Sequence, residues 1–237
     1  MLKSVIFDMD GVLVNTEPIH FKMIQEFFRE KGIELEYDVY APCIGSTTVY
    51  LRGLLIDRYG IDIFEKSNQA RIKEYEAAII ARDGYGEIPG VRGLIEDLRA
   101  HGMKLAVASS SFYDLIVRTT KDIGLYGYFD RIVSGADVPH PKPAPDVFRK
   151  AMDELGVKPE ECVIVEDSAN GVRAAKAAGA ACLGFYNPDS GNQDLKPADL
   201  VTEGFEEIDY AFMERLHHRV FGIPVTIAQG MAGAGDI

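Results

Sequence analysis

Five short apolar runs typical of β-strands recur along this chain of 237 residues, and segments with helical periodicity separate most of them. The runs lie at residues 4–7, 104–108, 131–133, 162–165 and 181–185. The helical segments lie at 91–100, 113–123, 144–155 and 171–178, and one more helix is expected within 205–220. Strands that alternate with helices are connected by crossovers, which produce parallel strand pairs. The pattern therefore predicts an α/β fold with a mostly parallel sheet.

Residues 16–86 interrupt this alternation, because they contain several amphipathic helical patterns and no convincing strand. The first helix is marked by Pro18 in its first turn and by an apolar stripe at helical spacing. The stripe consists of Ile19, Met23, Ile24, Phe27 and Phe28. Further helices are expected at 49–59 and 64–81. We therefore expect a small helical domain, 16–86, inserted after the first strand of a core domain, 1–15 and 87–237, whose residues 222–237 form a partly disordered tail.

The first predicted strand ends in Asp8-Met9-Asp10-Gly11. Alternation in an extended segment points Asp8 and Asp10 to the same side, and Gly11 permits a sharp change of backbone direction after them. Ligands of open α/β sheets bind outside the carboxyl ends of the strands. Asp-Gly is also a common turn dipeptide, so this stretch alone leaves open both a reactive site and an ordinary turn.

Later segments also place polar side chains after predicted strands, namely Ser109, Lys142 and the pair Glu166-Asp167. Because the carboxyl ends of parallel strands share one edge, we expect these residues to converge with Asp8 and Asp10. Carboxylate oxygens suit Mg²⁺, which shares its ligand shell with substrate phosphates. Lys142 would contribute positive charge for a phosphate, and the Ser109 hydroxyl with the backbone amide that follows it, that of Ser110, would bond phosphoryl oxygens.

Each of these residues also has an ordinary structural interpretation. Ser109 could cap a helix, and Lys142 could be a solvated loop lysine, although the prolines around it make its backbone rigid. Glu166 and Asp167 could favour the positive N-terminal end of the following helix. Their order and their shared position after strands favour a common site.

The charge and cysteine content exclude several classes of protein. The formal net charge of −12 disfavours nucleic acid and anionic membranes as main partners, since both require clustered lysine and arginine. The three cysteines, Cys43, Cys162 and Cys182, have no metal-ligand spacing. No stretch resembles a signal peptide or a membrane span. We expect a cytoplasmic protein, a monomer or weak homodimer, whose partner is a small molecule.

Four segments together resemble the motifs of the haloacid dehalogenase superfamily, namely Asp8-Met9-Asp10-Gly11-Val12-Leu13, Ser109, Lys142-Pro143 and Glu166-Asp167-Ser168. Asp10 to Pro18 with His20, followed by the helical insert, resembles the branch of β-phosphoglucomutase-like proteins and sugar-phosphate phosphatases. The resemblance covers residues 2 to about 200. It implies a Rossmann-like three-layer core with a small helical cap.

The resemblance also implies catalytic roles. Asp8 would attack phosphorus to form an aspartyl-phosphate, and Asp10 would protonate the leaving group and later deprotonate water. Asp8, the main-chain carbonyl of Asp10 and Asp167 would hold Mg²⁺, with Glu166 as a ligand or close by. Ser109 and Lys142 would complete the catalytic set.

The expected activity is that of a Mg²⁺-dependent phosphatase for a small sugar or polyol phosphate. The main alternative is a phosphomutase, which grips a bisphosphate with a basic pair in the cap loop, whereas this loop reads Cys43-Ile44-Gly45-Ser46-Thr47-Thr48. A dehalogenase would need neither Asp10 nor the acidic pair, and a non-catalytic interaction module would need none of the set. The expected substrate-binding residues are Thr16, His20, Ser46, Thr47, Ser110 and Arg71.

Overall fold

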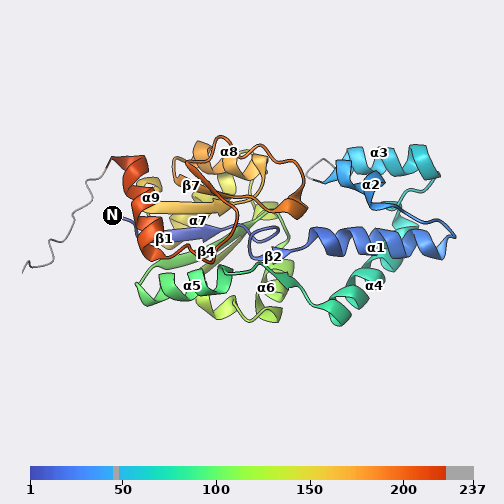
Figure 1. Cartoon of the computed structure of the whole chain (residues 1–237), viewed down its shortest axis with the longest axis horizontal. Coiled ribbons are helices and arrows are strands. Elements are labelled where there is room, and N and C mark those ends of the chain that lie inside the picture. The colour runs from blue at the N-terminus through green and yellow to red at the C-terminus, as the bar shows by residue number, and fades with distance from the viewer. Residues whose placement is uncertain (45–47, 223–237) are drawn as a thin grey trace, which may run out of the picture.

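The computed structural model describes residues 1–44 and 48–222. In this part of the chain, six parallel strands form one sheet in the order β5-β4-β1-β6-β7-β8 (Figure 1). The strands are β1 Ser4–Phe7, β4 Lys104–Ser109, β5 Arg131–Ser134, β6 Cys162–Glu166, β7 Ala181–Phe185 and β8 Leu200–Thr202. The predicted α/β fold with a mostly parallel sheet is confirmed, and β8 is a strand that the sequence pattern missed.

Helices cover both faces of this sheet and give a Rossmann-like, three-layered core. The helices are α5 Val91–Ala100, α6 Tyr113–Asp122, α7 Asp146–Leu155, α8 Ala169–Ala178 and α9 Tyr210–Phe221. On one face, Val5 and Phe7 of β1 pack in a cluster with apolar residues of α5, α6 and α9. On the other face, Ile6 packs with residues of α7 and α8. Burial on both faces explains why the central strands are continuous apolar runs.

Residues 16–86 hold four α-helices within the described ranges, α1 Glu17–Glu30, α2 Tyr37–Tyr40, α3 Thr48–Tyr59 and α4 Lys66–Asp83. They share an apolar cluster of their own, in which Phe27, Phe28 and Leu55 are fully covered. Two short antiparallel strands, β2 Val14–Asn15 and β3 Gly86–Glu87, connect this helical part to the core. Figure 1 shows the helical part beyond the end of the sheet at which β1 leads into β2.

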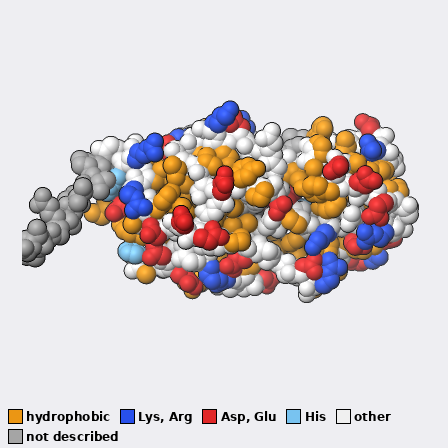
Figure 2. Space-filling model, viewed as in Figure 1, with side chains coloured by type: hydrophobic (Ala, Val, Ile, Leu, Met, Phe, Trp, Pro, Cys, Tyr) orange, Lys and Arg blue, Asp and Glu red, His pale blue; other side chains and the backbone are white. Residues whose placement is uncertain are grey.

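Short 3₁₀ turns complete the connections, η1 Ala41–Cys43, η2 Tyr126–Tyr128, η3 Gly135–Asp137, η4 Pro159–Glu161 and η5 Pro188–Ser190. None of the helices in the described ranges is both long enough and apolar enough to cross a bilayer. On the face shown in Figure 2, basic and acidic side chains are interspersed. The tail prediction for 222–237 lies outside the described residues except for Gly222, which follows α9.

Candidate active site

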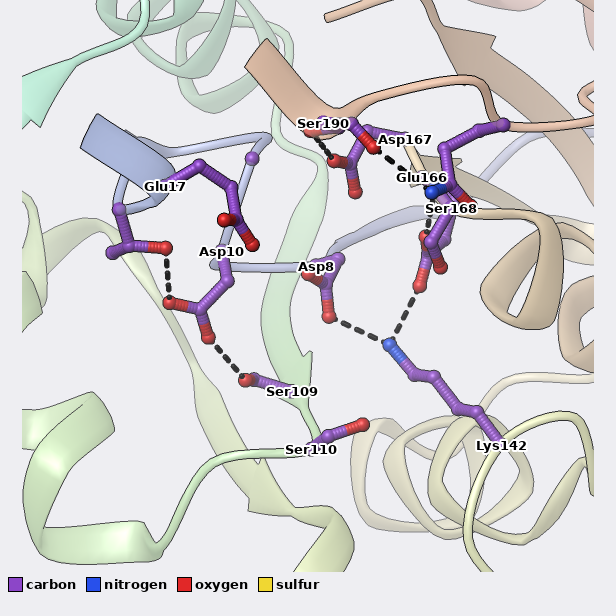
Figure 3. Close-up of a pocket in the computed structure, with 13 residues that line it drawn as sticks. Asp8, Asp10, Glu17, Ser109, Ser110, Lys142, Glu166, Asp167, Ser168 and Ser190 are labelled. Atoms are coloured by element: carbon purple, nitrogen blue, oxygen red, sulfur yellow. Dashed lines mark hydrogen bonds and ion pairs between the residues drawn. The ribbon is translucent and has the colours of Figure 1, made fainter. Parts of the chain in front are cut away.

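A cavity of about 200 Å³ lies at the carboxyl ends of the neighbouring strands β4, β1 and β6 (Figure 3). The predicted residues that line it are Asp8, Asp10, Thr16, Ser109, Ser110, Lys142, Glu166 and Asp167. They come from positions far apart in the chain, and the parallel sheet aligns the strand ends that carry most of them. Five lining residues were not among the predicted site residues, namely Gly11, Glu17 from α1, Ser168, and Ser190 and Gln193 from the segment after β7.

Asp8, Glu166 and Asp167 form a buried acidic cluster. Each offers a carboxylate oxygen, and these oxygens all lie within 4.8 Å of one another. Burial raises the pKa of Asp8 well above its usual value; Lys142 opposes this shift, and the neighbouring carboxylates add to it. Burial and the charge of Glu166 raise the pKa of Asp167 to about 8. An all-oxygen cluster with this excess of negative charge fits a hard divalent cation such as Mg²⁺.

Two glycines make room for this cluster. A side chain at Gly11 would overlap the carboxylate of Asp167, and Gly11 has a positive φ of 81°, which glycine adopts without strain. A side chain at Gly171, in the first turn of α8, would overlap the carboxyl group of Glu166. Ser190 holds Asp167 from the other side by donating its hydroxyl to Oδ2.

Lys142 is buried between two of the acids, with its side chain only 7% exposed. Its ammonium group donates to Asp8 Oδ1 and Glu166 Oε1, both at 2.6 Å, and to the carbonyl of Ala108 at 3.1 Å. Burial opposes its charge, but Asp8 and Glu166 outweigh burial and raise the pKa of Lys142 above its usual range. The alternative of a solvated loop lysine is therefore wrong.

The second oxygen of Glu166 is also occupied, because Oε2 accepts from the amide and the hydroxyl of Ser168, both at 3.0 Å. Ser168 in turn caps α8 by accepting from the Gly171 amide. Glu166 is thus held from both ends, with 1% of its surface exposed. These contacts orient Lys142 toward Asp8.

Asp10 is held separately from the acidic cluster by three hydroxyl groups. Thr16 donates to Oδ1 at 3.0 Å, and Ser111 and Ser109 donate to Oδ2 at 2.9 Å and 3.3 Å. The Asp10 carboxylate is not among the oxygens that form the cation-sized cluster in the described residues. A carboxylate held beside a charged centre by hydroxyl donors can exchange protons with a bound ligand. Ser111 was not anticipated, although its place in the serine run after β4 was a signal.

Two of the other predicted substrate-binding residues, Arg71 and His20, do not line this cavity. Arg71 lies on α4, where its guanidinium group is bound by Glu30, Glu74 and Tyr75. The side chains of Arg71, Glu30 and Glu74 are exposed, and none of them lines the cavity. His20 is half-buried on α1 and does not line the cavity. Ser46 and Thr47 lie outside the described residues.

A Rossmann-like sheet whose first strand leads into two aspartates, with a buried lysine and a second acidic pair beside the first aspartate, defines a phosphoric monoester hydrolase. The family model for haloacid dehalogenase-like hydrolases matches residues 5–185, and the chain belongs to this family. Within the family it belongs to the branch of phosphatases and β-phosphoglucomutase-like proteins.

Similar proteins carry names that indicate phosphorylated carbohydrates. The chain is 32% identical to "Phosphorylated carbohydrates phosphatase" of Thermotoga maritima over 178 residues, covering 75% of this chain and 82% of the relative. It is 32% identical to "Fructose-1-phosphate phosphatase YqaB" of Escherichia coli over 178 residues, covering 74% and 92%. A crystal structure of a CbbY variant from Rhodobacter sphaeroides with xylulose-(1,5)bisphosphate has a TM-score of 0.73 and 28% identity, covering 90% of this chain and 99% of that chain.

Proposed function

We propose that this protein is a Mg²⁺-dependent phosphatase that hydrolyses a small phosphorylated sugar or polyol through an aspartyl-phosphate on Asp8. The observation that carries the proposal is that the two aspartates have different surroundings. Asp8 lies in the acidic cluster against Lys142, whereas hydroxyl groups hold Asp10 apart. The names of the similar phosphatases support the choice of substrate class.

The Mg²⁺ site would be formed by Asp8 and Asp167, with the main-chain carbonyl of Asp10 and with Glu166 as a ligand or close neighbour. The oxygen donors and their mutual distances fit this ion, because Lys142 is one positive charge among three buried carboxylates. When bound, Mg²⁺ would neutralise the charge of the phosphoryl oxygens and of the acidic cluster.

In the first half-reaction, Asp8 attacks phosphorus and the bond from phosphorus to the ester oxygen breaks. Asp10 gives a proton to the departing alkoxide, while Lys142 and Ser109 stabilise the phosphoryl oxygens. In the second half-reaction, water attacks the aspartyl-phosphate and Asp10 accepts its proton. Inorganic phosphate leaves, and Asp8 is restored.

We further propose that residues 16–86 act as a cap that covers the cavity during turnover, with β2 and β3 as the connections about which it moves. Thr16 and Glu17 lie directly after β2 and line the cavity, which supports this role. Closure over the site would exclude water until the second half-reaction.

The small number of cationic side chains in the described lining of the cavity favours a phosphatase over a phosphomutase. Of the described residues that line the cavity, Lys142 is the one cation, and the sequence of the predicted cap loop has glycine, serine and threonine at 45–47. A mutase must hold the second phosphate of a bisphosphate, which would require another cation.

A screen of phosphorylated metabolites for phosphate release, with Mg²⁺ and after chelation, tests the phosphatase. The Asp8→Asn variant is the control, and turnover no greater than that of this variant would refute an Asp8-dependent enzyme. Glucose 1-phosphate with a trace of glucose 1,6-bisphosphate separates the two activities. Free phosphate is expected, whereas glucose 6-phosphate without phosphate release would establish the mutase.

A further inference from the structure

We propose that Glu17 determines which leaving groups the site accepts: it selects a neutral hydroxyl next to the phosphoester and rejects a carboxylate at the same position. This inference rests on the proposed phosphatase function and makes its substrate class narrower. The names of the similar phosphatases indicate phosphorylated carbohydrates, but they do not say which residue selects the leaving group.

The first support is the position of Glu17 in the cavity. Glu17 is the first residue of α1 and lines the same cavity as Asp8 and Lys142. In Figure 3, Glu17 lies on the side of Asp8 that carries the Asp10 carboxylate, and Lys142 lies on the opposite side. Glu17 therefore faces the part of the cavity away from the lysine.

This part of the cavity must receive the leaving group. Asp10 can protonate the leaving oxygen only if that oxygen lies beside its carboxylate. Thr16, whose hydroxyl bonds Asp10 Oδ1 at 3.0 Å, precedes Glu17 directly in the chain. The phosphoryl group is placed by Asp8 and Lys142, so the carbons attached to the leaving oxygen extend toward Glu17.

The second support is that Glu17 is held in place but keeps one oxygen available. The Tyr40 hydroxyl donates to Glu17 Oε2 at 3.0 Å, and Tyr40 is only 4% exposed. Burial and the charge of Glu17 raise the pKa of Tyr40, so the phenol remains a donor. Glu17 Oε1 has no hydrogen-bond partner among the described residues and can accept from a substrate hydroxyl.

The third support is the charge of the surroundings. Glu17 has no ion-pair partner within the part of the chain that the structure describes, and Lys22, which shares a neighbouring cavity of about 270 Å³ with Glu17, is paired with Asp83. Asp189 also lines that cavity. A carboxylate in the leaving group would therefore meet the uncompensated charge of Glu17, whereas a hydroxyl would find an acceptor there.

Three substrates of nearly equal size test the inference with the full chain and Mg²⁺: 2-hydroxyethyl phosphate, phosphoglycolate and propyl phosphate. They place a hydroxyl, a carboxylate or a methyl group at the same distance from the phosphoester. We expect the wild type to prefer 2-hydroxyethyl phosphate to phosphoglycolate by at least about 10-fold in kcat/KM. The hydroxyl can donate a hydrogen bond to the Glu17 carboxylate, whereas the carboxylate of phosphoglycolate is repelled by it. In Glu17→Gln this ratio should fall to within about 3-fold, because the repulsion is lost.

A control variant, a reference substrate and inhibition measurements separate a specific effect of Glu17 from a general loss of activity. Glu34→Gln alters another glutamate of the helical part that does not line the cavity, and it should retain the wild-type ratio. Propyl phosphate carries neither a hydroxyl nor a carboxylate at this position, so its rate in Glu17→Gln measures the effect of the change on the rest of the site, and the other two rates are compared with it. The inhibition constants of the same compounds against p-nitrophenyl phosphate give the discrimination even where turnover is slow, and circular dichroism confirms that the variant folds.

The two proposals fail in different ways. If the wild type releases phosphate but Glu17→Gln keeps the wild-type ratio in both turnover and inhibition, Glu17 does not select the leaving group and the inference is overturned. If neither p-nitrophenyl phosphate nor any of the three substrates is hydrolysed above the Asp8→Asn control, the phosphatase itself is overturned, and the inference with it.

Discussion

The ammonium nitrogen of Lys142 lies 2.6 Å from Asp8 Oδ1, although 134 residues separate the two in the chain. Glu166 holds the same nitrogen at 2.6 Å, so Lys142 neutralises part of a cluster that would otherwise be a set of unpaired buried carboxylates. The lysine therefore stabilises the fold of the site, and in the proposed reaction it would supply positive charge to the phosphoryl group.

Replacement of this lysine should damage both properties. Lys142→Met is expected to lower phosphate release by at least about 100-fold, since a preorganised donor is lost. Urea denaturation should show a loss of about 3–5 kcal/mol in the free energy of unfolding, because two buried carboxylates lose their partner. Lys150→Met, which alters a lysine of α7 that does not line the site cavity, is the control. A Lys142→Met enzyme with near-wild-type turnover would contradict this role.

Gly171 should tolerate no side chain, because even a Cβ there would overlap the Glu166 carboxyl group. We expect Gly171→Ala to lower the free energy of unfolding by about 1–3 kcal/mol and to reduce turnover as Glu166 moves from Lys142. Gly93 is the matched control, because it lies within α5 and a Cβ there would meet no atom within 4 Å other than its chain neighbours and the nearby backbone of its own helix. Gly93→Ala should stabilise the protein by about 0.5–1 kcal/mol, and similar effects at the two glycines would refute the steric explanation.

Much of the sheet could be predicted because its central strands are buried on both faces and therefore appear as apolar runs. The runs at 4–7 and 181–185 coincide with β1 and β7. β8 was missed because it is a short edge strand with Val201 exposed, so it lacks an apolar run. The short strands β2 and β3 have two residues each, too few for a periodic signal.

The site was predictable where residues follow strands and less so elsewhere. Ser190 reaches Asp167 from a 3₁₀ turn after β7, and no local pattern indicates that contact. Arg71 was expected at the site from the resemblance of the cap to the family, but that resemblance does not say which neighbours its side chain meets. Its partner Glu30 is known only from the packing of α1 against α4, whereas Glu74 and Tyr75 lie three and four residues further along α4 itself.

Ser111 should act by positioning Asp10 for proton transfer. Ser111→Ala removes the 2.9 Å hydrogen bond, and we expect about a 10-fold loss of kcat for alkyl phosphates with little change in KM. p-Nitrophenyl phosphate, whose leaving group needs little protonation, should be affected less than about 2-fold. Asp10→Asn removes the proton-transferring carboxylate itself, so its loss of kcat is the largest that a mispositioned Asp10 could cause. Equal losses for both kinds of leaving group would mean that Ser111 supports the site only structurally.

His217 should make the folded protein less stable in acid. It is fully buried on α9 with Nε2 2.8 Å from the Glu160 carbonyl, and burial lowers its pKa below the ordinary 6.5. As the pH falls below 6.5, the unfolded chain therefore takes up a proton that the folded protein does not, and stability is lost by up to about 1.4 kcal/mol per pH unit. The difference in unfolding free energy between the wild type and His217→Gln should be constant above pH 7 and shrink below it. A profile for His217→Gln parallel to the wild type would show that His217 is not the titrating group.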